Sequence, residues 1–198
     1  MYRELRKLAR NHLILTATRR LALRLQQNLP DFSESAVQAA PPIDALQDWL
    51  VKGWESLLVS GHTQDKLLSP LQEQGVWISL VKESPESQNL IKPYHTAKMM
   101  MQTWKLLKQW RLDIDEIDWS RNEEGNLYAH FAKKFQEKLK SHFFTQAELI
   151  DKLMQHLTSF IGYLSDHYPD KKMALVGFDD IPPQLNHFLE GLKEQGWE

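Results

Sequence analysis

The sequence predicts an α/β fold in which a partial parallel sheet is interrupted by a large all-helical insertion. Two short apolar runs, Leu13–Thr16 and Met173–Val176, have the composition of buried strands, and a helical pattern follows each of them. Strands followed by helices are typical of a parallel sheet with helices packed on it. Most of the chain between the two runs has helical spacing. We therefore expect an α/β domain formed by residues 1–62 and 169–198, and a helical subdomain formed by residues 63–168.

The first strand leads into a helix that places Leu21, Leu25 and Leu29 on one face. Pro30 is expected to end this helix, because proline has no amide donor and its ring clashes with the preceding turn. The polar connection that follows contains a candidate short strand at Ala36–Ala40. This part of the chain thus predicts one strand–helix unit and suggests the start of a second.

The next helix begins near a candidate N-cap at Asp44, with Gln47 as its reciprocal partner. Near the other end of the chain, the run Met173–Val176 lacks alternation, which predicts a strand covered on both faces. Two prolines, Pro182 and Pro183, then open the last helix. These segments complete the expected α/β domain.

Two capping-box patterns mark helix starts inside the expected insertion. Ser69 is followed at the right spacing by Gln72, and Thr145 by Glu148. The acidic segment Asp113–Gly125 is poor in aliphatic residues, so we expect a surface loop there.

Composition and charge restrict the class of protein. The chain is 42% hydrophobic and 25% charged, contains no cysteine and has no apolar run of membrane-spanning length. The missing cysteines exclude disulfides and thiolate metal sites and favour a reducing compartment, so we expect a cytoplasmic protein without a membrane partner. Residues 1–30 carry seven Lys/Arg against one acid, while the remainder is acidic. A basic end predicts a local anion-binding face; the alternative is a solvated helix face.

The specific motifs of several enzyme classes are missing from the sequence. None of the eight glycines lies in the G-x-x-x-x-G-K-[ST] pattern that surrounds nucleotide phosphates. The eight histidines include no H-E-x-x-H motif, and no nucleophile-elbow sequence is present. We therefore expect no catalytic residue, no metal site and no cofactor in this chain.

The segment Met173–Gln184, MALVGFDDIPPQ, resembles the second motif of superfamily 1 DNA helicases. In that family an apolar strand ends in Asp-Glu, which is followed by a phenylalanine, Gln-Asp and a nearby Pro-Gln. Aligning Phe178 with the family phenylalanine puts Val176 and Gly177 where the metal-binding and catalytic carboxylates belong. The resemblance therefore implies a motif without its acids.

Two adjacent carboxylates, Asp179 and Asp180, lie three positions after the places where the family has its acids. They are a candidate metal site on chemistry alone. The favoured interpretation is a strand-end turn whose acids stabilise the start of the following helix. Together with Gly177, Phe178 and Gln184 they form a degenerate, structural version of the motif.

The same stretch is similar to the G-F-x-x-(F/L)-(T/P)-P-Q segment of AddB-like subunits of bacterial helicase–nucleases and of related predicted DNA-repair proteins. The segment Leu13–Leu25 resembles the family's strand–T-P-N-R-R-L-A sequence, with Ala17 in place of the proline and Thr18 in place of the asparagine. The segment Ile43–Leu58 has the position of the family's L-x-x-W-L sequence. The three segments occur in the family's order.

This resemblance implies a sheet of P-loop or helicase-like type that carries a helical insert, and a RecB-type nuclease domain downstream. The chain ends after a helix, where an α/β domain is expected to enter another strand, so we expect a fragment of a longer protein. Exonuclease activity is then expected of that longer protein and not of this chain.

Four residues at the first strand–helix junction are candidate nucleic-acid contacts: Thr16, Thr18, Arg19 and Arg20. Exposed amides at a helix start favour phosphate, and two arginines add charge and donors. The alternative is that Thr18 is only an N-cap and that both arginines are solvated.

The sequence thus predicts a non-catalytic, helicase-like region of a DNA-repair helicase–nuclease, serving as a scaffold and as a surface for the DNA backbone. Expected partners are single-stranded or duplex-end DNA and an ATP-dependent helicase subunit. One alternative is a helical protein–protein interaction module that does not bind DNA. A third possibility is an active NTPase with an unusual phosphate site.

Overall fold

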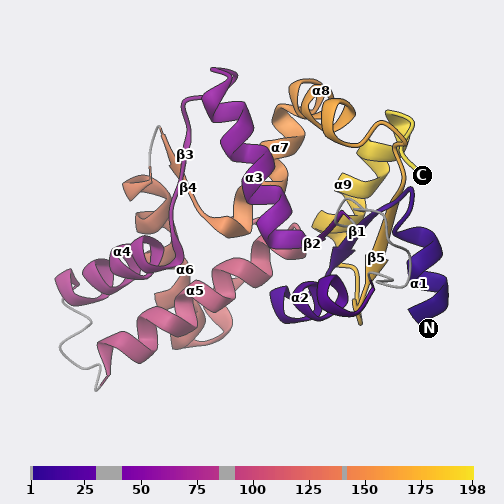
Figure 1. The fold of residues 1–198 in the computed structure, drawn as a ribbon. Coiled ribbons are helices and arrows are strands. Elements are labelled where there is room, and N and C mark those ends of the chain that lie inside the picture. The colour runs from indigo at the N-terminus through magenta and orange to yellow at the C-terminus, as the bar shows by residue number, and fades with distance from the viewer. Residues whose placement is uncertain (1, 30–41, 85–91, 140–141) are drawn as a thin grey trace. The chain divides into compact units, whose positions relative to one another are not determined.

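The computed structural model describes residues 2–29, 42–84, 92–139 and 142–198 (Figure 1). The chain divides into two compact units. The sheet unit consists of Met1–Thr63, Leu153–Ile181 and Asn186–Glu198, and the helical unit consists of Gln64–Lys152 and Pro182–Leu185. The domain bounds expected from the sequence stay predictions, and the two units are described one at a time.

The sheet unit contains a three-stranded parallel sheet with the order β2–β1–β5. Its strands are β1 (Leu13–Thr16), β2 (Ile43–Ala45) and β5 (Met173–Val176). Thr16 pairs with Ala45 on one side and with Val176 on the other. The mixed α/β character and the parallel sheet predicted from the sequence are confirmed.

The two apolar strands differ in burial. Every residue of β1 is buried, whereas all four residues of β5 are only half-buried. The expectation that β5 is covered on both faces was therefore wrong. Within the described chain β5 has β1 as its single strand neighbour, and on its other side only Glu198 pairs with its start. The Glu198 amide donates to the Lys171 carbonyl at 2.9 Å, and the Met173 amide donates to the Glu198 carbonyl at 2.8 Å.

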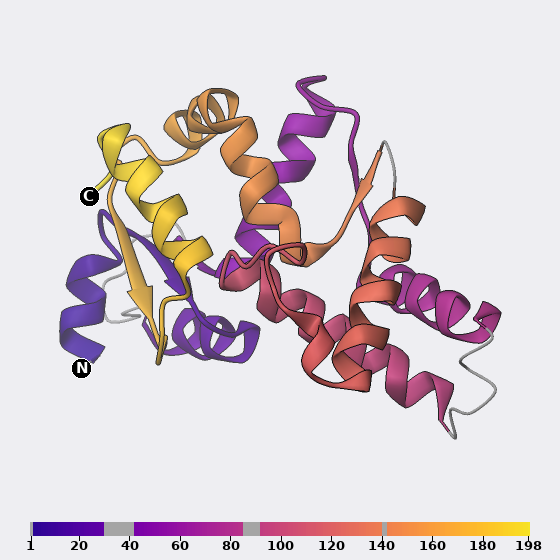
Figure 2. The same cartoon turned by 180° about the vertical axis from the view of Figure 1, so that it is seen from behind.

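The helices of the sheet unit pack against β1 from two sides. They are α1 (Tyr2–Leu8), α2 (Arg19–Asn28), α3 (Leu46–Val59), α8 (Leu157–His167) and most of α9 (Pro183–Glu194). Ile14 shares one apolar cluster with Leu5 of α1 and Leu25 of α2. Side chains alternate along a strand, so Leu13 and Leu15 point to the opposite face. Figure 2 shows α9 running back beside β5.

An aromatic group on the helices of the sheet unit joins α3, α8 and α9. The Trp49 ring lies edge-on to Phe160 at 5.5 Å between centroids and to Phe188 at 6.3 Å. All three side chains are buried. Edge-to-face aromatic pairs contribute beyond the area they bury, so this group fixes the three helices to one another.

The helical unit is built around α4 (Pro70–Glu83), α5 (Pro93–Gln109) and α6 (Glu123–Lys138), followed by the first residues of α7 (Leu149–Gln155). Its core is an aromatic cluster. Trp77 stacks on Phe135 with 3.9 Å between ring centroids, and Trp104 meets Phe135 edge-on at 5.5 Å. The Trp104 indole donates to the buried Thr145 hydroxyl at 3.3 Å.

The segment expected to be all-helical is not. It contains a pair of two-residue parallel strands, β3 (Lys66–Leu67) and β4 (Phe143–Phe144). The Leu68 amide extends the pairing with a bond to the Phe144 carbonyl. Strands this short produce no periodicity in the sequence, so the helical pattern around them concealed them.

Both predicted capping boxes inside the helical unit are confirmed. The Gln72 amide donates to the Ser69 hydroxyl at 3.3 Å, and the Gln72 side chain accepts from the Ser69 amide at 2.9 Å. Thr145 and Glu148 form the second box, which opens a 3-10 turn before α7. The helical run after it breaks at His156, which separates α7 from α8.

The predicted cap at Asp44 was wrong. Asp44 lies in β2, and Ala45 occupies the N-cap position of α3 without a side-chain bond. The Asp44 carboxylate instead accepts two hydrogen bonds from Lys52 at 2.8 and 2.9 Å. Pairing of β2 with β1 fixes an extended backbone at this position, and that pairing outweighs the local preference of aspartate for a helix start.

The expected loop at 113–125 was wrong in part. It contains a 3-10 turn at Trp119–Arg121 and the first residues of α6. The Trp119 indole donates to the Ile114 carbonyl at 2.7 Å, and Ile114 is itself buried. Ile114, Ile117 and Trp119 thus anchor a segment whose composition is mostly acidic.

The helix that follows β1 ends at Asn28, with Leu29 as its cap. The proposed stop at Pro30 and the candidate strand at Ala36–Ala40 lie outside the described residues. Among the helices that the structure describes, none combines the length and the apolar character needed to cross a bilayer.

Candidate functional site

The candidate site is the carboxyl edge of the sheet, where β1 and β5 end side by side. The Ala17 amide donates to the Val176 carbonyl at 3.1 Å, which joins the start of α2 to the turn after β5. Open parallel sheets bind ligands outside the carboxyl ends of their strands. The two sequence segments that carry the predicted site residues therefore meet at one edge, although about 160 positions separate them in the sequence.

Thr16 does not reach the surface of this edge. Its side chain is fully buried, and its hydroxyl donates to the Thr18 carbonyl at 2.9 Å and lies 3.3 Å from the Asp44 carbonyl. The predicted contact between Thr16 and nucleic acid is therefore corrected. Thr16 fastens the ends of β1 and β2 to the first turn of α2 instead.

Thr18 is the N-cap of α2. Its hydroxyl accepts a hydrogen bond from the Leu21 amide at 3.3 Å, as predicted for the capping role. The amides of Arg19 and Arg20 belong to the first turn, where a helix offers donors without intrahelical acceptors. These amides are the part of α2 that can meet an anion.

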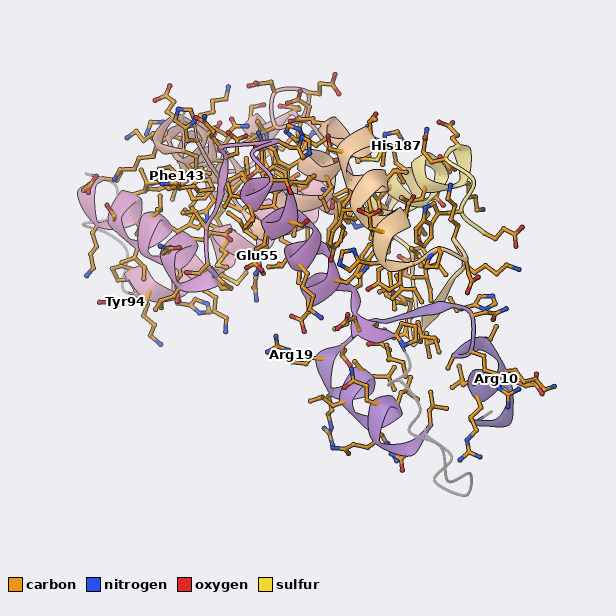
Figure 3. The ribbon with its side chains drawn as sticks, turned by 45° about the horizontal axis from the view of Figure 1, so that its top comes forward. Arg10, Arg19, Glu55, Tyr94, Phe143 and His187 are labelled. Carbon is orange, nitrogen blue, oxygen red and sulfur yellow. The ribbon has the colours of Figure 1, made fainter. Side chains whose placement is uncertain are left out.

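Arg19 is held by an acid at the start of the neighbouring helix. Its Nε donates to Asp48 Oδ2 at 2.7 Å, and its Nη2 donates to Asp48 Oδ1 at 2.9 Å. This two-point ion pair raises the pKa of Arg19, although 74% of the side chain remains exposed (Figure 3). A phosphate that binds Arg19 must therefore either share the guanidinium group with Asp48 or displace Asp48 from it.

Three further arginines of this part of the chain are exposed. Arg20 and Arg24 lie on α2, and Arg10 lies just after α1 (Figure 3). Within the part of the chain that the structure describes, Arg20 forms no ion pair, so its charge remains available to a ligand.

Asp179 and Asp180 lie exposed in the turn after β5. Asp180 Oδ1 accepts a hydrogen bond from the Ile181 amide at 2.9 Å, which orders the approach to α9. In the described ranges no three His, Asp or Glu side chains gather closely enough to hold a metal ion.

Gly177 occupies the position where the resembling helicase motif has a carboxylate. Its φ is +79°, in the left-handed region, and a Cβ added there lies 2.5 Å from Leu21 Cδ2. A side chain at this position thus meets both backbone strain and a steric conflict. Phe178, the next residue, is half-buried.

Gln184 has a structural role inside the helical unit. The side chain is buried, and its Nε2 donates to the Ala147 carbonyl and to Asp151 Oδ2, both at 2.8 Å. These two bonds tie the first turn of α9 to the start of α7. The glutamine of the degenerate motif is therefore an anchor and does not face solvent.

The helical unit contains a hollow of about 300 Å³ that the sequence did not predict. Lys108 and Arg111 line it from the end of α5, and Asp113 and Asp151 supply opposite charges. Arg111 adopts a left-handed φ of 54°, a conformation that usually selects glycine. The only sequence signal was Lys108, which interrupts the apolar stripe of α5. Because charges of both signs line the hollow, its chemistry selects no single class of ligand.

Comparison with known proteins leaves the candidate site without an assigned family. A scan against protein-family models and a search of curated proteins both find no match to the chain.

Proposed function

We propose that the chain is a non-catalytic, helicase-like region of an AddB-like DNA-repair helicase–nuclease, acting as a scaffold and as a surface for the backbone of single-stranded DNA. In this proposal the sheet belongs to a sheet of P-loop type, and the helical unit is the insertion in it. ATP-driven movement comes from a partner subunit, and nuclease chemistry comes from another domain of the longer protein.

One observation carries this proposal: the start of α2 and the turn after β5 lie at the same sheet edge. The two segments are those whose sequences resemble the helicase-like family. Their adjacency is what a shared ligand-binding edge requires.

The geometry of Gly177 supports a role without ATP hydrolysis. An acid at that position meets left-handed backbone strain and requires the Leu21 side chain to move. The nearby acids Asp179 and Asp180 are exposed, and Asp180 is engaged by a backbone amide. The phosphate loop is also missing from the sequence.

The DNA contact in this proposal uses three residues at the start of α2. The first-turn amides of Arg19 and Arg20 and the exposed guanidinium of Arg20 meet one phosphate, since anions bind at helix starts. Arg19 contributes after partial release from Asp48. Thr18 acts indirectly, by holding the turn in place.

The test is the salt dependence of binding to a fluorescein-labelled oligothymidylate, measured by anisotropy. Each phosphate contact contributes a slope of about 0.7 to the plot of log affinity against log salt. The double variant Arg19→Ala/Arg20→Ala should bind more weakly and lower the slope by up to about 0.7, because both guanidinium groups serve one phosphate contact.

The matched control is Lys133→Ala/Lys134→Ala on α6, which removes the same charge from the helical unit. Binding that ignores salt, or an equal loss in both double variants, contradicts a DNA surface at α2. The family assignment is tested separately, by reading the gene downstream of the Glu198 codon: a RecB-type nuclease domain there supports it, and a stop codon or an unrelated domain contradicts it.

A specific observation also favours a second candidate function, a helical protein–protein interaction module. In the helical unit, Met99 and Leu106 of α5 and Trp110, the residue that caps the end of α5, are exposed apolar side chains. Binding of a protein by the helical unit, combined with no DNA affinity in the anisotropy assay, selects this function over the first.

A further inference from the structure

The outer edge of β5 offers backbone groups that the described chain does not use. The Ala17 amide donates to the Val176 carbonyl, so the backbone of Val176 faces β1. Successive residues of a strand face alternate edges, and the N–H and C=O of Leu175 therefore point away from β1. Among the residues that the structure describes, none pairs with Leu175 on that outer side. A further strand can bind there.

The composition of β5 is that of an inner strand. All four of its residues, Met173–Val176, are apolar, and all four are only half-buried. Parallel strands of this composition are normally covered on both faces and paired at both edges. Strands that stay at an edge usually carry charges or proline, which discourage further pairing, and β5 has neither.

Glu198 already begins a pairing at this edge. Its amide donates to the Lys171 carbonyl at 2.9 Å, and its carbonyl accepts from the Met173 amide at 2.8 Å. The two partners flank Lys172, which is the hydrogen-bond pattern of a parallel pair. An antiparallel pair exchanges both bonds with a single residue. Glu198 is therefore aligned with Lys172 in the parallel direction.

The end of α9 directs the chain into this position. Gly196 has a left-handed φ of +84°, and its amide donates to the Lys193 carbonyl at 2.9 Å. The Trp197 amide donates to the Leu192 carbonyl at 3.1 Å, which completes the glycine-terminated helix end known as the Schellman motif. The Trp197 side chain is buried. Figure 2 shows the C-terminal end beside the start of β5.

We propose that the residues following Glu198 in the longer protein form a further parallel strand on the outer edge of β5. The sheet order then becomes β2–β1–β5 followed by the added strand. The helix α9 is the crossover between β5 and this strand, as parallel neighbours require. The inference uses the longer chain of the proposed function, but it depends neither on the family nor on the DNA contact.

The alignment of Glu198 with Lys172 sets the register of the added strand. The second residue after Glu198 lies opposite Ala174, where its amide donates to the Met173 carbonyl and its carbonyl accepts from the Leu175 amide. The fourth residue bonds the Leu175 carbonyl and the Gly177 amide in the same way. About five residues, rich in Val, Ile and Leu, are expected in this strand.

The added strand also extends the candidate site. Its carboxyl end lies beside Gly177, at the sheet edge where β1 and β5 end. Ligands of open parallel sheets bind outside the carboxyl ends of the strands. The residue that follows the added strand is therefore a further member of the ligand-binding edge, supplied by the chain beyond Glu198.

The experiment compares residues 1–198 with the full gene product by hydrogen exchange, resolved to single amides by mass spectrometry. In the full product the Leu175 and Gly177 amides should exchange at least about 100-fold more slowly, because each donates to the added strand. The Val176 amide faces β1 in both chains and is the internal reference.

Two proline variants of the full gene product provide a matched pair. A proline at the second position after Glu198 removes the amide that donates to Met173, and should return Leu175 to fast exchange. A proline at the third position removes an amide that faces away from β5, and should leave Leu175 protected.

Several results overturn the proposal. They are a stop codon or a charged, proline-rich segment directly after Glu198, fast exchange of Leu175 and Gly177 in the full gene product, or equal effects of the two prolines. Protection of Leu175 in residues 1–198 that disappears on dilution assigns the edge to a second copy instead. Slow exchange at Leu175 combined with an unrelated downstream domain supports the strand and rejects the family, whereas a RecB-type nuclease domain with fast exchange does the reverse.

Discussion

The sheet unit and the helical unit place their charges differently. In the sheet unit the charged groups that matter for binding, such as Arg19 and Asp48, lie at an exposed edge above a buried strand. In the helical unit a carboxyl group, Glu73, is buried beside the aromatic core and has only 3% of its surface exposed. Charge in the sheet unit is therefore placed where ligands and salt reach it. In the helical unit a buried carboxyl group couples the free energy of unfolding to pH.

The two units also differ in what holds them together. The sheet unit depends on pairing between β1 and β5, which are far apart in the sequence. The helical unit depends on contacts such as Trp77 with Phe135 between helices of amphipathic pattern. Each unit should therefore respond separately to changes in its own core.

The largest effect is expected from truncating a core phenylalanine. Phe135→Ala should lower the free energy of unfolding of the helical unit by about 3–5 kcal/mol, because it removes a stacked ring and leaves a cavity. Urea denaturation measures the loss, and hydrogen exchange should localise it to α4, α5 and α6. Phe160→Ala is the matched change in the sheet unit, where Phe160 is equally buried. Equal loss of protection in both units from either variant contradicts their independence.

The next effect concerns pH. Burial raises the pKa of Glu73 from 4.5 to about 7, with Glu148 adding to the rise and Lys105 opposing it. Between pH 4.5 and 7 the unfolded chain is ionised here while the folded chain keeps its proton, so stability falls as pH rises. Glu73→Gln should remove this fall.

Each pKa unit corresponds to about 1.4 kcal/mol. Relative to the unmodified chain, Glu73→Gln should therefore raise the free energy of unfolding by about 2–3 kcal/mol at pH 8 and change it little at pH 4. Denaturation curves at the two pH values measure the difference. An equal effect of the substitution at both values would show that Glu73 does not titrate in the folded chain near neutrality.

A smaller effect is expected at the sheet edge. Gly177→Ala should destabilise the sheet unit by about 1–3 kcal/mol, from left-handed strain plus the conflict with Leu21. Gly61→Ala is the control, because Gly61 has a similar φ of +74° but open space around its Cβ position. Thermal unfolding should therefore rank Gly177→Ala as the more damaging. A reversed order would mean that Leu21 yields without cost.

The smallest effect on stability is expected from Asp48→Asn. It removes an exposed ion pair, which contributes little to stability because water and salt screen it. The same change frees Arg19 and should tighten oligothymidylate binding at low salt, if the edge meets phosphate as proposed. Unchanged or weaker binding in an anisotropy titration would count against a phosphate contact by Arg19.

Local patterns predicted much of this structure. The Ser69 and Thr145 capping boxes, the strand at Leu13–Thr16 and the strand at Met173–Val176 follow from residues close together in the sequence. Capping pairs and short apolar runs are local patterns, so a single sequence contains them.

The features that the sequence did not predict depend on distant partners. The carboxylate of Asp44 resembled a helix cap, but pairing with β1 made it part of a strand. The β3–β4 pair joins residues more than seventy positions apart and is two residues long. At the site, Thr16 was a predicted nucleic-acid contact because it lies where a strand turns into a helix, and its hydroxyl instead reaches the Asp44 carbonyl of another strand.

The conformation of Gly177 has a consequence for protein engineering. A metal-binding acid introduced here as Gly177→Asp meets a left-handed backbone and requires the Leu21 side chain to move. Combining it with Leu21→Ala would relieve the contact and leave the backbone strain in place. Acidic ligands grafted onto this sheet edge are therefore better placed at positions other than Gly177.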